Sequence, residues 1–439
     1  MRESRTSGSV GSRAGNGPAD PILLPPRLAA AGRPPGRRIV QFRFPDLDHN
    51  AGAPLDPRVD EALRELGPVA DGNPHAAHER GRAARGVLEA ARERIAAVVG
   101  RRPDEVVFCS GGTEANNIAV ATGARLARAR RLPFVVSPIE HPSVALPVSD
   151  LRGDARLDVR VLDIEADPRF ALVLPREAVA FVTCIVAQGE VGTLQDLPQL
   201  RAGIDAACAS AGAPRPVLHS DASQGLGRVN LAAALEVADL VTLSPHKVGG
   251  PRGIGVLLAR EGLSLAAVLR GGAQELGRRP GTQSPRLAHG AALAIELACV
   301  EWQERAATMR ANLDAFLSGL AARRAEGAVQ VIGEDRLPCS PHALLPNTRS
   351  LLCPGVDARV LLPALDVQGI GVSHGSACSS GASEPSSLLV SLGLTPAEAR
   401  STLRVSVGAH PENEKLRHAG GLFSQVLGAF GGEGRRKTR

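Results

Sequence analysis

The chain has 439 residues, of which 44% are hydrophobic and 22% are charged. This size and balance are typical of a globular protein with two domains and a large core. The aromatic share of 2% argues against a protein that binds single-stranded nucleic acid by stacking bases. The net charge of +6 belongs to the two ends, because residues 1–44 carry +6 and residues 433–439 carry +3, which leaves −3 for the rest. Direct DNA binding by the folded body is therefore not expected.

The two ends of the chain and its cysteines indicate which segments are disordered and in which compartment the protein is expected. Residues 1–40 are rich in Gly, Pro, Ser and Arg and predict a disordered basic extension, and residues 431–439 predict a basic tail. The seven Cys stand singly, without a pair or a His/Cys cluster at metal spacing. This pattern favours reduced thiols in a cytoplasmic protein without a bound metal. No apolar run approaches the length of a membrane span, so no membrane association is expected.

Short apolar runs alternate with helical patterns from about residue 55 to residue 290. One helical face gathers apolar residues in His78–Val99, namely Val87, Ala91, Ile95 and Val98. The expected strands are Glu105–Cys109, Pro133–Ser137, Asp158–Leu162, Val179–Val186, Val217–Ser220, Leu240–Leu243 and Ile254–Ala259. The alternation predicts an α/β domain with a mainly parallel seven-stranded sheet and helices on both sides.

A long helical stretch follows at about Pro285–Arg324, and the last third of the chain then mixes strands with helices. The expected strands of this part are Val329–Ile332, Arg349–Cys353 and Leu403–Val407. We expect a large domain at residues 55–290 and a smaller α+β domain built from residues 41–54 and 291–430. Ligands of open α/β sheets bind at the carboxyl ends of the strands, so the candidate site begins with the residues found there.

A glycine turn follows the first expected strand, in the run Phe108–Asn117. The strand leads into Gly111, Gly112 and Thr113, where a helix begins. Free backbone N–H groups at a helix N-terminus, together with a Thr hydroxyl, can hold a phosphate group. A glycine turn before an ordinary Thr N-cap gives the same short pattern, so this run alone leaves phosphate binding open.

Two further strand ends carry a carboxylate and a lysine. Asp221 follows the strand that begins at Val217, and a buried carboxylate there needs a cationic partner, such as a protonated pyridine nitrogen. Lys247 follows the next strand, where a lysine of lowered pKa can form a Schiff base. Taken singly, Asp221 also fits a helix cap and Lys247 a solvated loop. The ordered set of phosphate turn, Asp and Lys at three strand ends favours a cofactor site.

This ordered set resembles the aminotransferase class V family of fold-type I pyridoxal-phosphate (PLP) enzymes, and within it the cysteine desulfurases. The similarity runs from about Leu47 to Glu414. It is carried by Leu47–Ala51, Gly72–Pro74, Ser110–Asn117, Glu140–His141, Asp221–Gln224, Ser244–Lys247, Gly281–Thr282, Leu345–Thr348, Gly375–Cys378 and Leu403–Gly408. The resemblance implies the fold-type I architecture, PLP as cofactor and conversion of L-cysteine to L-alanine.

The resemblance also implies a role for each matching residue at the cofactor. Lys247 would hold PLP covalently, Asp221 would pair with its ring nitrogen, and Gln224 would bond its ring oxygen. His141 would stack on the ring and take part in proton transfer. The phosphate group would be held by Gly112, Thr113, Ser244 and His246.

Substrate and subunit contacts are implied in the same way. Arg404 would bind the substrate carboxylate through its bidentate fork, assisted by Asn73. Thr282 matches a residue that reaches the phosphate group of a neighbouring subunit, so a homodimer is implied.

Cys378 lies in Ser373–Pro385, a run of small residues. A nucleophile that takes sulfur at one site and delivers it elsewhere needs an exposed loop, whereas a structural Cys sits more often in an apolar run, as Cys184 does. An incidental loop thiol is the alternative. The resemblance implies that the Cys378 thiolate attacks the substrate sulfur, which gives a persulfide and free alanine, and that an acceptor protein then receives the sulfur.

The chain departs from the family pattern around the expected cofactor. Gln188 and Gly189 stand where the family typically has two Asn, the second of which bonds the ring oxygen. Gly189 cannot make that bond, which leaves it to Gln224, unless Gln188 substitutes. Smaller departures are Gly52-Ala53 for two Thr, Pro245 for Gly, Val248-Gly249 for Ile/Leu-Tyr, Gln283-Ser284 after the Gly-Thr pair, and Gly408–Pro411 without the usual Arg and Thr.

Three functions stay open on the sequence: a cysteine desulfurase, a selenocysteine lyase or other class V lyase or aminotransferase, and a catalytically weak scaffold paralogue in sulfur transfer. The loop at Cys378 resembles the longer loop of desulfurases and favours cysteine as substrate. The retained Lys247 and Cys378 argue against the scaffold, and Gly189 argues mildly for it. The acceptor, such as a scaffold for iron–sulfur clusters, is left open.

Overall fold

The computed structural model of the protein describes residues 46–163, 175–339, 343–375 and 385–431. All of them belong to one unit of the chain, Phe42–Arg439. The predicted division of this unit into a large domain at 55–290 and a small domain at 41–54 and 291–430 stays a prediction.

The larger sheet has seven strands in the order β1-β7-β6-β5-β4-β2-β3. Its strands are β1 Val106–Cys109, β2 Phe134–Val136, β3 Val159–Val161, β4 Phe181–Thr183, β5 Val217–Asp221, β6 Leu240–Leu243 and β7 Gly255–Ala259. Neighbours from β6 to β3 pair in parallel, whereas β7 is antiparallel to both β1 and β6. The predicted α/β fold with a mainly parallel seven-stranded sheet is confirmed.

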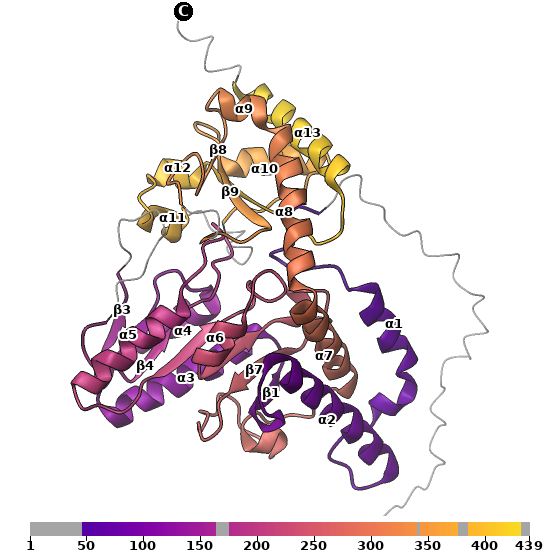
Figure 1. Ribbon diagram of the computed structural model, residues 1–439, viewed down its shortest axis with the longest axis vertical. Helices are drawn as coiled ribbons and strands as arrows, with labels where there is room; N and C mark the ends of the chain where they lie inside the picture. The colour runs from indigo at the N-terminus through magenta and orange to yellow at the C-terminus, as the bar shows by residue number, and fades with distance from the viewer. Residues whose placement is uncertain (1–45, 164–174, 340–342, 376–384, 432–439) are drawn as a thin grey trace, which may run out of the picture. The chain divides into compact units, whose positions relative to one another are not determined.

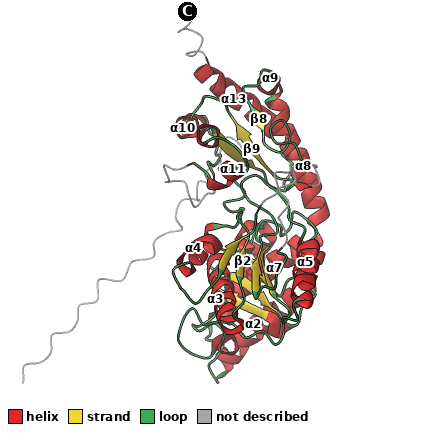
Figure 2. Cartoon of the chain, turned by 90° about the vertical axis from the view of Figure 1, so that its left-hand side faces the viewer, coloured by secondary structure: helices red, strands yellow, loops and turns green. Residues whose placement is uncertain are grey.

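Helices cover both faces of this sheet, as Figures 1 and 2 show. Alternating side chains of each strand point to opposite faces. In β1, Val107 and Cys109 pack with α3 and α4, whereas Val106 and Phe108 belong to the core shared with α2, α5 and α7. The helices and 3-10 turns of this part are α1 Pro57–Glu65, η1 Gly67–Asp71, α2 Glu79–Val99, η2 Pro103–Glu105, α3 Gly112–Arg130, α4 Pro142–Leu151, α5 Leu197–Ser210, α6 Ala232–Val237, η3 Pro245–Lys247, η4 Gln274–Gly277 and α7 Pro285–Val300.

The smaller sheet has three antiparallel strands in the order β10-β9-β8. They are β8 Gln330–Val331, β9 Thr348–Leu352 and β10 Thr402–Ser406. A separate apolar core joins β9 and β10 to α8, α10 and α13. The helices of this part are α8 Trp302–Gly319, α9 Ala321–Ala325, α10 Ala358–Val367, α11 Ser387–Ser391, α12 Pro396–Arg400 and α13 Asn413–Gly431. The single stretch predicted at Pro285–Arg324 is therefore three helices, with breaks at Glu301 and Leu320.

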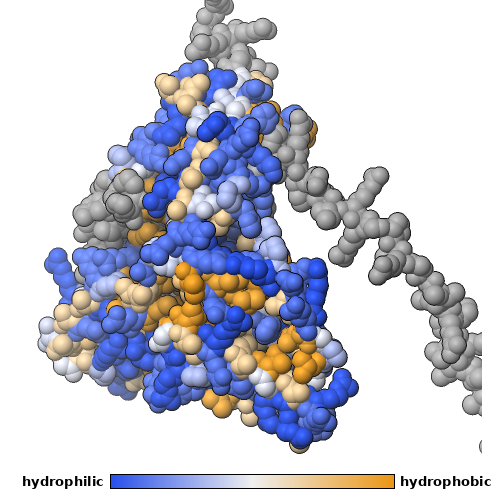
Figure 3. All heavy atoms as spheres, turned by 45° about the vertical axis from the view of Figure 1, so that its right-hand side comes forward, coloured by the Kyte–Doolittle hydropathy of each residue, from blue (hydrophilic) through white to orange (hydrophobic). Residues whose placement is uncertain are grey.

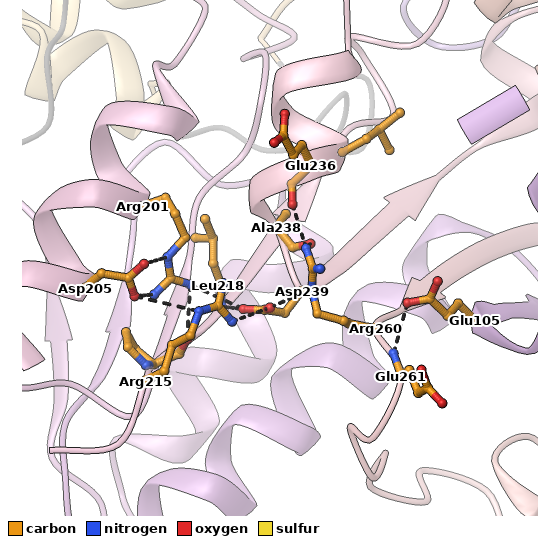
Figure 4. Close-up of polar contacts among 12 residues, drawn as sticks. Glu105, Arg201, Asp205, Arg215, Leu218, Glu236, Ala238, Asp239, Arg260 and Glu261 are labelled. Atoms are coloured by element: carbon orange, nitrogen blue, oxygen red, sulfur yellow. Dashed lines mark hydrogen bonds and ion pairs between the residues drawn. The ribbon is translucent and has the colours of Figure 1, made fainter. Parts of the chain in front are cut away.

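An arginine cluster stabilises the amino end of β6, away from the strand ends that carry the candidate site (Figure 4). Asp239 is 3% exposed and precedes β6 directly. Its carboxylate pairs with Arg215 at 2.7 Å, Arg260 at 3.0 Å and Arg201 at 3.3 Å. It also accepts a hydrogen bond from the backbone N–H of Leu218 in β5 at 2.9 Å. One buried carboxylate thus ties β5 and β6 to three cations.

The described ranges lack a membrane-spanning helix and a metal-binding cluster. None of their helices is both long and apolar enough to cross a membrane. The same residues contain no group of three or more His, Cys, Asp or Glu side chains placed to hold a metal ion.

Candidate active site

The candidate site forms where the parallel strands end. β1 runs into the start of α3 at Gly112, β2 leads to His141 at the N-cap of α4, β5 ends on Asp221, and β6 is followed by η3 with Lys247. Strands that run in one direction bring their carboxyl ends to one edge of the sheet, so residues far apart in sequence meet there. Across the sheet the strands that carry these residues lie in the order β1, β6, β5 and β2, so their order in space differs from their order along the chain.

A chain of hydrogen bonds links Asp221 to His141. The Asn116 side-chain amide donates to Asp221 Oδ2 and to Ser143 Oγ, both at 2.8 Å. Ser143 Oγ lies 2.7 Å from His141 Nδ1, and the Ser143 backbone N–H donates to the same nitrogen at 3.1 Å. Because Nδ1 accepts this bond, the neutral ring carries its proton on Nε2.

The two ionisable groups that these hydrogen bonds link, Asp221 and His141, differ in charge: one is charged and the other is neutral. Burial by itself would raise the pKa of Asp221, but the charge of Lys247 and bonds from Ser223 and Asn116 outweigh it and lower the pKa. Burial and the nearby charge of Lys247 both lower the pKa of His141. At neutral pH the site therefore holds a carboxylate beside a neutral imidazole.

The predicted phosphate cradle lies at the start of α3. A Cβ at Gly112 would stand only 2.3 Å from Ser244 Oγ, so only glycine lets the helix start approach that hydroxyl. Ser244 Oγ also lies 2.8 Å from Ser223 Oγ. Thr113 follows in the first turn of α3 and is exposed. Backbone N–H groups and hydroxyls thus gather at one helix N-terminus, which suits an anion.

His246 and Lys247 both lie in η3 and are half-buried. Burial, together with the charges of Lys247 and Arg252, lowers the pKa of His246 to about 4. His246 is therefore a neutral donor or acceptor at neutral pH.

Gln224 fills the space that Gly189 leaves open. A Cβ on Gly189 would lie 2.9 Å from Gln224 Nε2 and 3.2 Å from its Cγ. The amide is already bonded at both ends, because Nε2 donates to the Asn50 carbonyl at 3.1 Å and Oε1 accepts from Arg228. The Gln188 side chain is used within its own turn, since its Oε1 accepts from the backbone N–H groups of Glu190 and Val191, both at 2.7 Å.

Arg404 lies in β10 and is 3% exposed. Its Nη2 pairs with Asp48 at 2.6 Å and its Nη1 donates to the Gly189 carbonyl at 3.2 Å. Asp48 also accepts from the Ser373 hydroxyl at 2.9 Å. The buried Nε of Arg404 has no partner within the described part of the chain. The guanidinium therefore holds one donor that these residues leave unused.

Thr282 and Asn73 lie apart from this cluster. Thr282 is exposed, and next to it the Gln283 amide donates to Glu275 at 2.8 Å and lies 3.0 Å from His75 Nε2. Asn73 is also exposed and accepts from the His75 backbone N–H. Neither Thr282 nor Asn73 bonds the groups around Asp221 among the described residues. Cys378 lies outside the described residues.

Several functional candidates were missed in the sequence. Asn116 and Asp48 belong to runs that matched the family, but nothing local assigned them a partner. Two buried acids were also missed: burial raises the pKa of Glu140, with the charge of Asp221 adding to it, and burial raises the pKa of Glu190, which accepts from Ser386. Of the two, only Glu140 lies within the field of the charged Asp221, and both effects there favour its protonated form.

The sheet order and the strand-end cluster define an α/β protein with the fold of type I PLP enzymes. The sequence matches the family described as Aminotransferase class-V over residues 46–418. The chain belongs to this family.

Relatives and solved structures of the family resemble the chain over most of its length. Cysteine desulfurase IscS 1 of Archaeoglobus fulgidus is 32% identical over 378 residues, which cover 85% of this chain and 94% of that protein. An IscS-like cysteine desulfurase of Mycobacterium tuberculosis is 34% identical, covering 82% and 91%. Selenocysteine lyase of Bos taurus is 31% identical, covering 87% and 92%. A solved structure described as a NifS-like protein has a TM-score of 0.77 at 27% identity, covering 88% of this chain and all of that one.

Proposed function

We propose that this chain is a PLP-dependent cysteine desulfurase that converts L-cysteine to L-alanine and leaves a persulfide on Cys378. The carrying observation is that Lys247, a charged Asp221 and a neutral His141 meet at the carboxyl ends of parallel strands. Relatives named cysteine desulfurases support the choice of reaction.

The described residues fit PLP. The open cradle at Gly112 and Ser244 suits the phosphate group, together with Thr113 and His246. Asp221 is buried yet charged, as a partner of a protonated pyridine nitrogen must be. When bound through Lys247, PLP supplies a ring that draws electrons from the bonds of the substrate α-carbon.

The protein's own side chains then bind and position the substrate. Arg404 suits the substrate carboxylate because its Nε has no partner and its planar fork binds carboxylates in two places. The substrate would have to compete with Asp48, which holds Nη2 at 2.6 Å. His141 can pass on the proton at Nε2, and Ser143 and Asn116 fix its orientation.

Sulfur transfer balances as a displacement at sulfur. The Cys378 thiolate bonds the substrate sulfur, the Cβ–S bond breaks, and a proton replaces sulfur on Cβ. Enzyme thiol and L-cysteine thus give enzyme persulfide and L-alanine, without an added oxidant or reductant. An acceptor protein then takes the terminal sulfur. A cytoplasmic location stays a prediction.

The proposal includes a homodimer in which Thr282 reaches the phosphate group of the neighbouring subunit. Thr282 is exposed on a segment anchored by Glu275, whose carboxylate pairs with Arg92 at 2.8 Å. The same connection carries exposed apolar residues, among them Leu276, which is 78% exposed. Apolar patches also stand among polar side chains on the face in Figure 3. Exposed apolar surface next to a site residue supports a contact between subunits.

The test is an assay of the purified chain with PLP, dithiothreitol and either L-cysteine or L-selenocysteine. We expect sulfide and alanine from L-cysteine at a higher kcat/KM than selenide from L-selenocysteine. Lys247→Ala should lose the visible absorption band of lysine-bound PLP. Cys378→Ala should keep this band and release no sulfide, whereas Cys339→Ala should match the wild type.

Each alternative has its own outcome in the same assay. A higher kcat/KM for L-selenocysteine assigns a selenocysteine lyase. A chain that binds PLP and produces no alanine from either substrate is the scaffold paralogue. Full sulfide release by Cys378→Ala would refute the persulfide step.

A further inference from the structure

A cavity of about 440 Å³ lies beside Lys247, which is the one member of the strand-end cluster among its described lining residues. Its floor is buried and includes Arg228 and Val248, whereas Pro54, Glu304 and His410 at its mouth are exposed. The groups assigned to the cofactor other than Lys247 do not line it; these are Gly112, Thr113, His141, Asp221, Gln224, Ser244 and His246. The cavity is thus a second space that touches the cofactor lysine.

Small residues keep this cavity open. Gly249 has φ of 93°, and a Cβ there would lie 2.9 Å from Asp56 Cβ. A Cβ on Gly408 would lie 2.4 Å from the His49 ring. Three departures from the family pattern, far apart in sequence, meet here, because the lining includes Ala53, Val248-Gly249 and Gly408–Pro411. The other departures, among them Gly189 and Pro245, do not line this cavity.

Four charged residues of the lining neutralise one another, whereas Glu304 at the mouth lies outside this group. Arg58 pairs with Asp56 at 2.8 Å and with Glu301 at 2.5 Å. Arg305 pairs with Glu301 at 3.0 Å and with Asp56 at 3.7 Å. Two acids and two arginines thus form a closed ring of ion pairs, which leaves no acid of the ring to serve the floor.

Among the described residues, Arg228 on the floor has no carboxylate partner. It is 2% exposed, and it donates to the Gln224 carbonyl at 3.1 Å, to Gln224 Oε1 and to the Lys247 carbonyl at 3.5 Å. These acceptors are all neutral, and Nε has no partner among the described residues. Burial, with the charge of Arg404, lowers the pKa of Arg228 to about 9, so it remains a cation at neutral pH. A buried cation without an anion is costly to fold.

We propose that this cavity binds a small anion, the carboxylate or phosphate group of a metabolite, with Arg228 as its charged contact. Arginine binds both groups through its planar fork, and an anion here would offset the buried charge. Because Arg228 also bonds the Lys247 carbonyl, the ligand would lie against the backbone of the cofactor lysine. The proposed site does not depend on the proposed reaction.

The test is a calorimetric titration of the full chain, loaded with PLP and freed of excess, with inorganic phosphate and separately with acetate at constant ionic strength. We expect one saturable site for each chain. The anion that binds more tightly shows whether the site prefers a phosphate or a carboxylate group. Arg228→Met should weaken binding by about tenfold or more, because the charged contact is lost. Arg58→Met removes the same charge at the exposed rim and should change affinity by less than about twofold.

A second variant keeps the test decisive if Arg228→Met does not fold. Ala409→Phe keeps Arg228 but fills the cavity, and it should also abolish saturable binding. Absence of saturable binding of both anions to the folded wild type overturns the proposal, as does equal weakening in Arg58→Met and Arg228→Met. PLP binding is measured separately by its visible absorption. Failure of the proposed function can therefore be told apart from failure of the proposed anion site.

Discussion

Asn116 donates a hydrogen bond to the Asp221 carboxylate, with 2.8 Å between Nδ2 and Oδ2. Asn116 lies in α3, the helix whose start forms the proposed phosphate cradle, and Asp221 ends β5. The same amide also bonds Ser143, which in turn bonds His141. One side chain therefore connects Asp221, the proposed partner of the ring nitrogen, to His141, the proposed proton carrier.

Replacing this amide should weaken the cofactor site. In Asn116→Ala the pKa of Asp221 rises, because a bond that holds it down is lost. A hydrogen bond to a charged group contributes roughly 1.5–3 kcal/mol, so the dissociation constant of PLP should rise by about tenfold or more. Titration of the visible absorption with PLP measures it. Asn117→Ala is the matched control, because that amide bonds only backbone carbonyls. Equal PLP affinity in the two variants would contradict the assigned link.

Restoring the family's residue at Gly189 should harm this protein. Gly189→Asn places a Cβ against Gln224, whose amide is fixed by Arg228 and Asn50. Overpacking and a disturbed buried bond should lower the free energy of unfolding by about 1–3 kcal/mol, as measured by urea denaturation. The double variant with Gln224→Ala should recover part of this loss, since the clash is removed. Additive losses in the double variant would mean that the two positions are not coupled.

The arginine cluster at β6 predicts a large stability effect remote from the site. Asp239→Ala removes the carboxylate from Arg201 Nη1, although Nε and Nη2 keep Asp205, and it leaves the buried Leu218 N–H without its acceptor. The free energy of unfolding should fall by about 3 kcal/mol or more. Asp158→Ala, which breaks one exposed pair with Arg160, should cost less than about 1 kcal/mol. A similar loss in both variants would show that the buried cluster contributes no more to the free energy of unfolding than an exposed ion pair does.

Because His219 is buried, we expect the free energy of unfolding to decrease at acidic pH. Burial lowers its pKa from 6.5 to about 4, although the charge of Asp221 opposes this shift. Between these two values the unfolded chain binds a proton that the folded chain does not, so the free energy of unfolding decreases as pH falls. From about pH 7 to pH 5 the wild type should lose about 2 kcal/mol more than His219→Gln. Denaturant unfolding at the two pH values measures this, and equal losses would exclude His219 as the source.

The strands, and the polar residues that follow them along the chain, were predictable because both depend on local patterns. The apolar runs near Cys109, Asp221 and Leu243 end where Gly, Asp and Ser begin, and the observed strands end there too. The direction of β7 was not predictable, because a buried strand has the same apolar pattern whether it runs parallel or antiparallel. The breaks at Glu301 and Leu320 were missed for a similar reason, since apolar spacing continues across them.

The sequence by itself determined the family, the fold class and the residues that meet at the strand ends, because local periodicity and ordered motifs carry that information. Only the tertiary structure decided the partners of those residues. Gln224 bonds Asn50, 174 positions away, and Arg404 pairs with Asp48, 356 positions away. Burial, which sets the charge of Asp221, His141 and Arg228, likewise depends on what packs around each group in space. A pattern along the chain names a side chain, whereas its partner and its charge state follow from the folded surroundings.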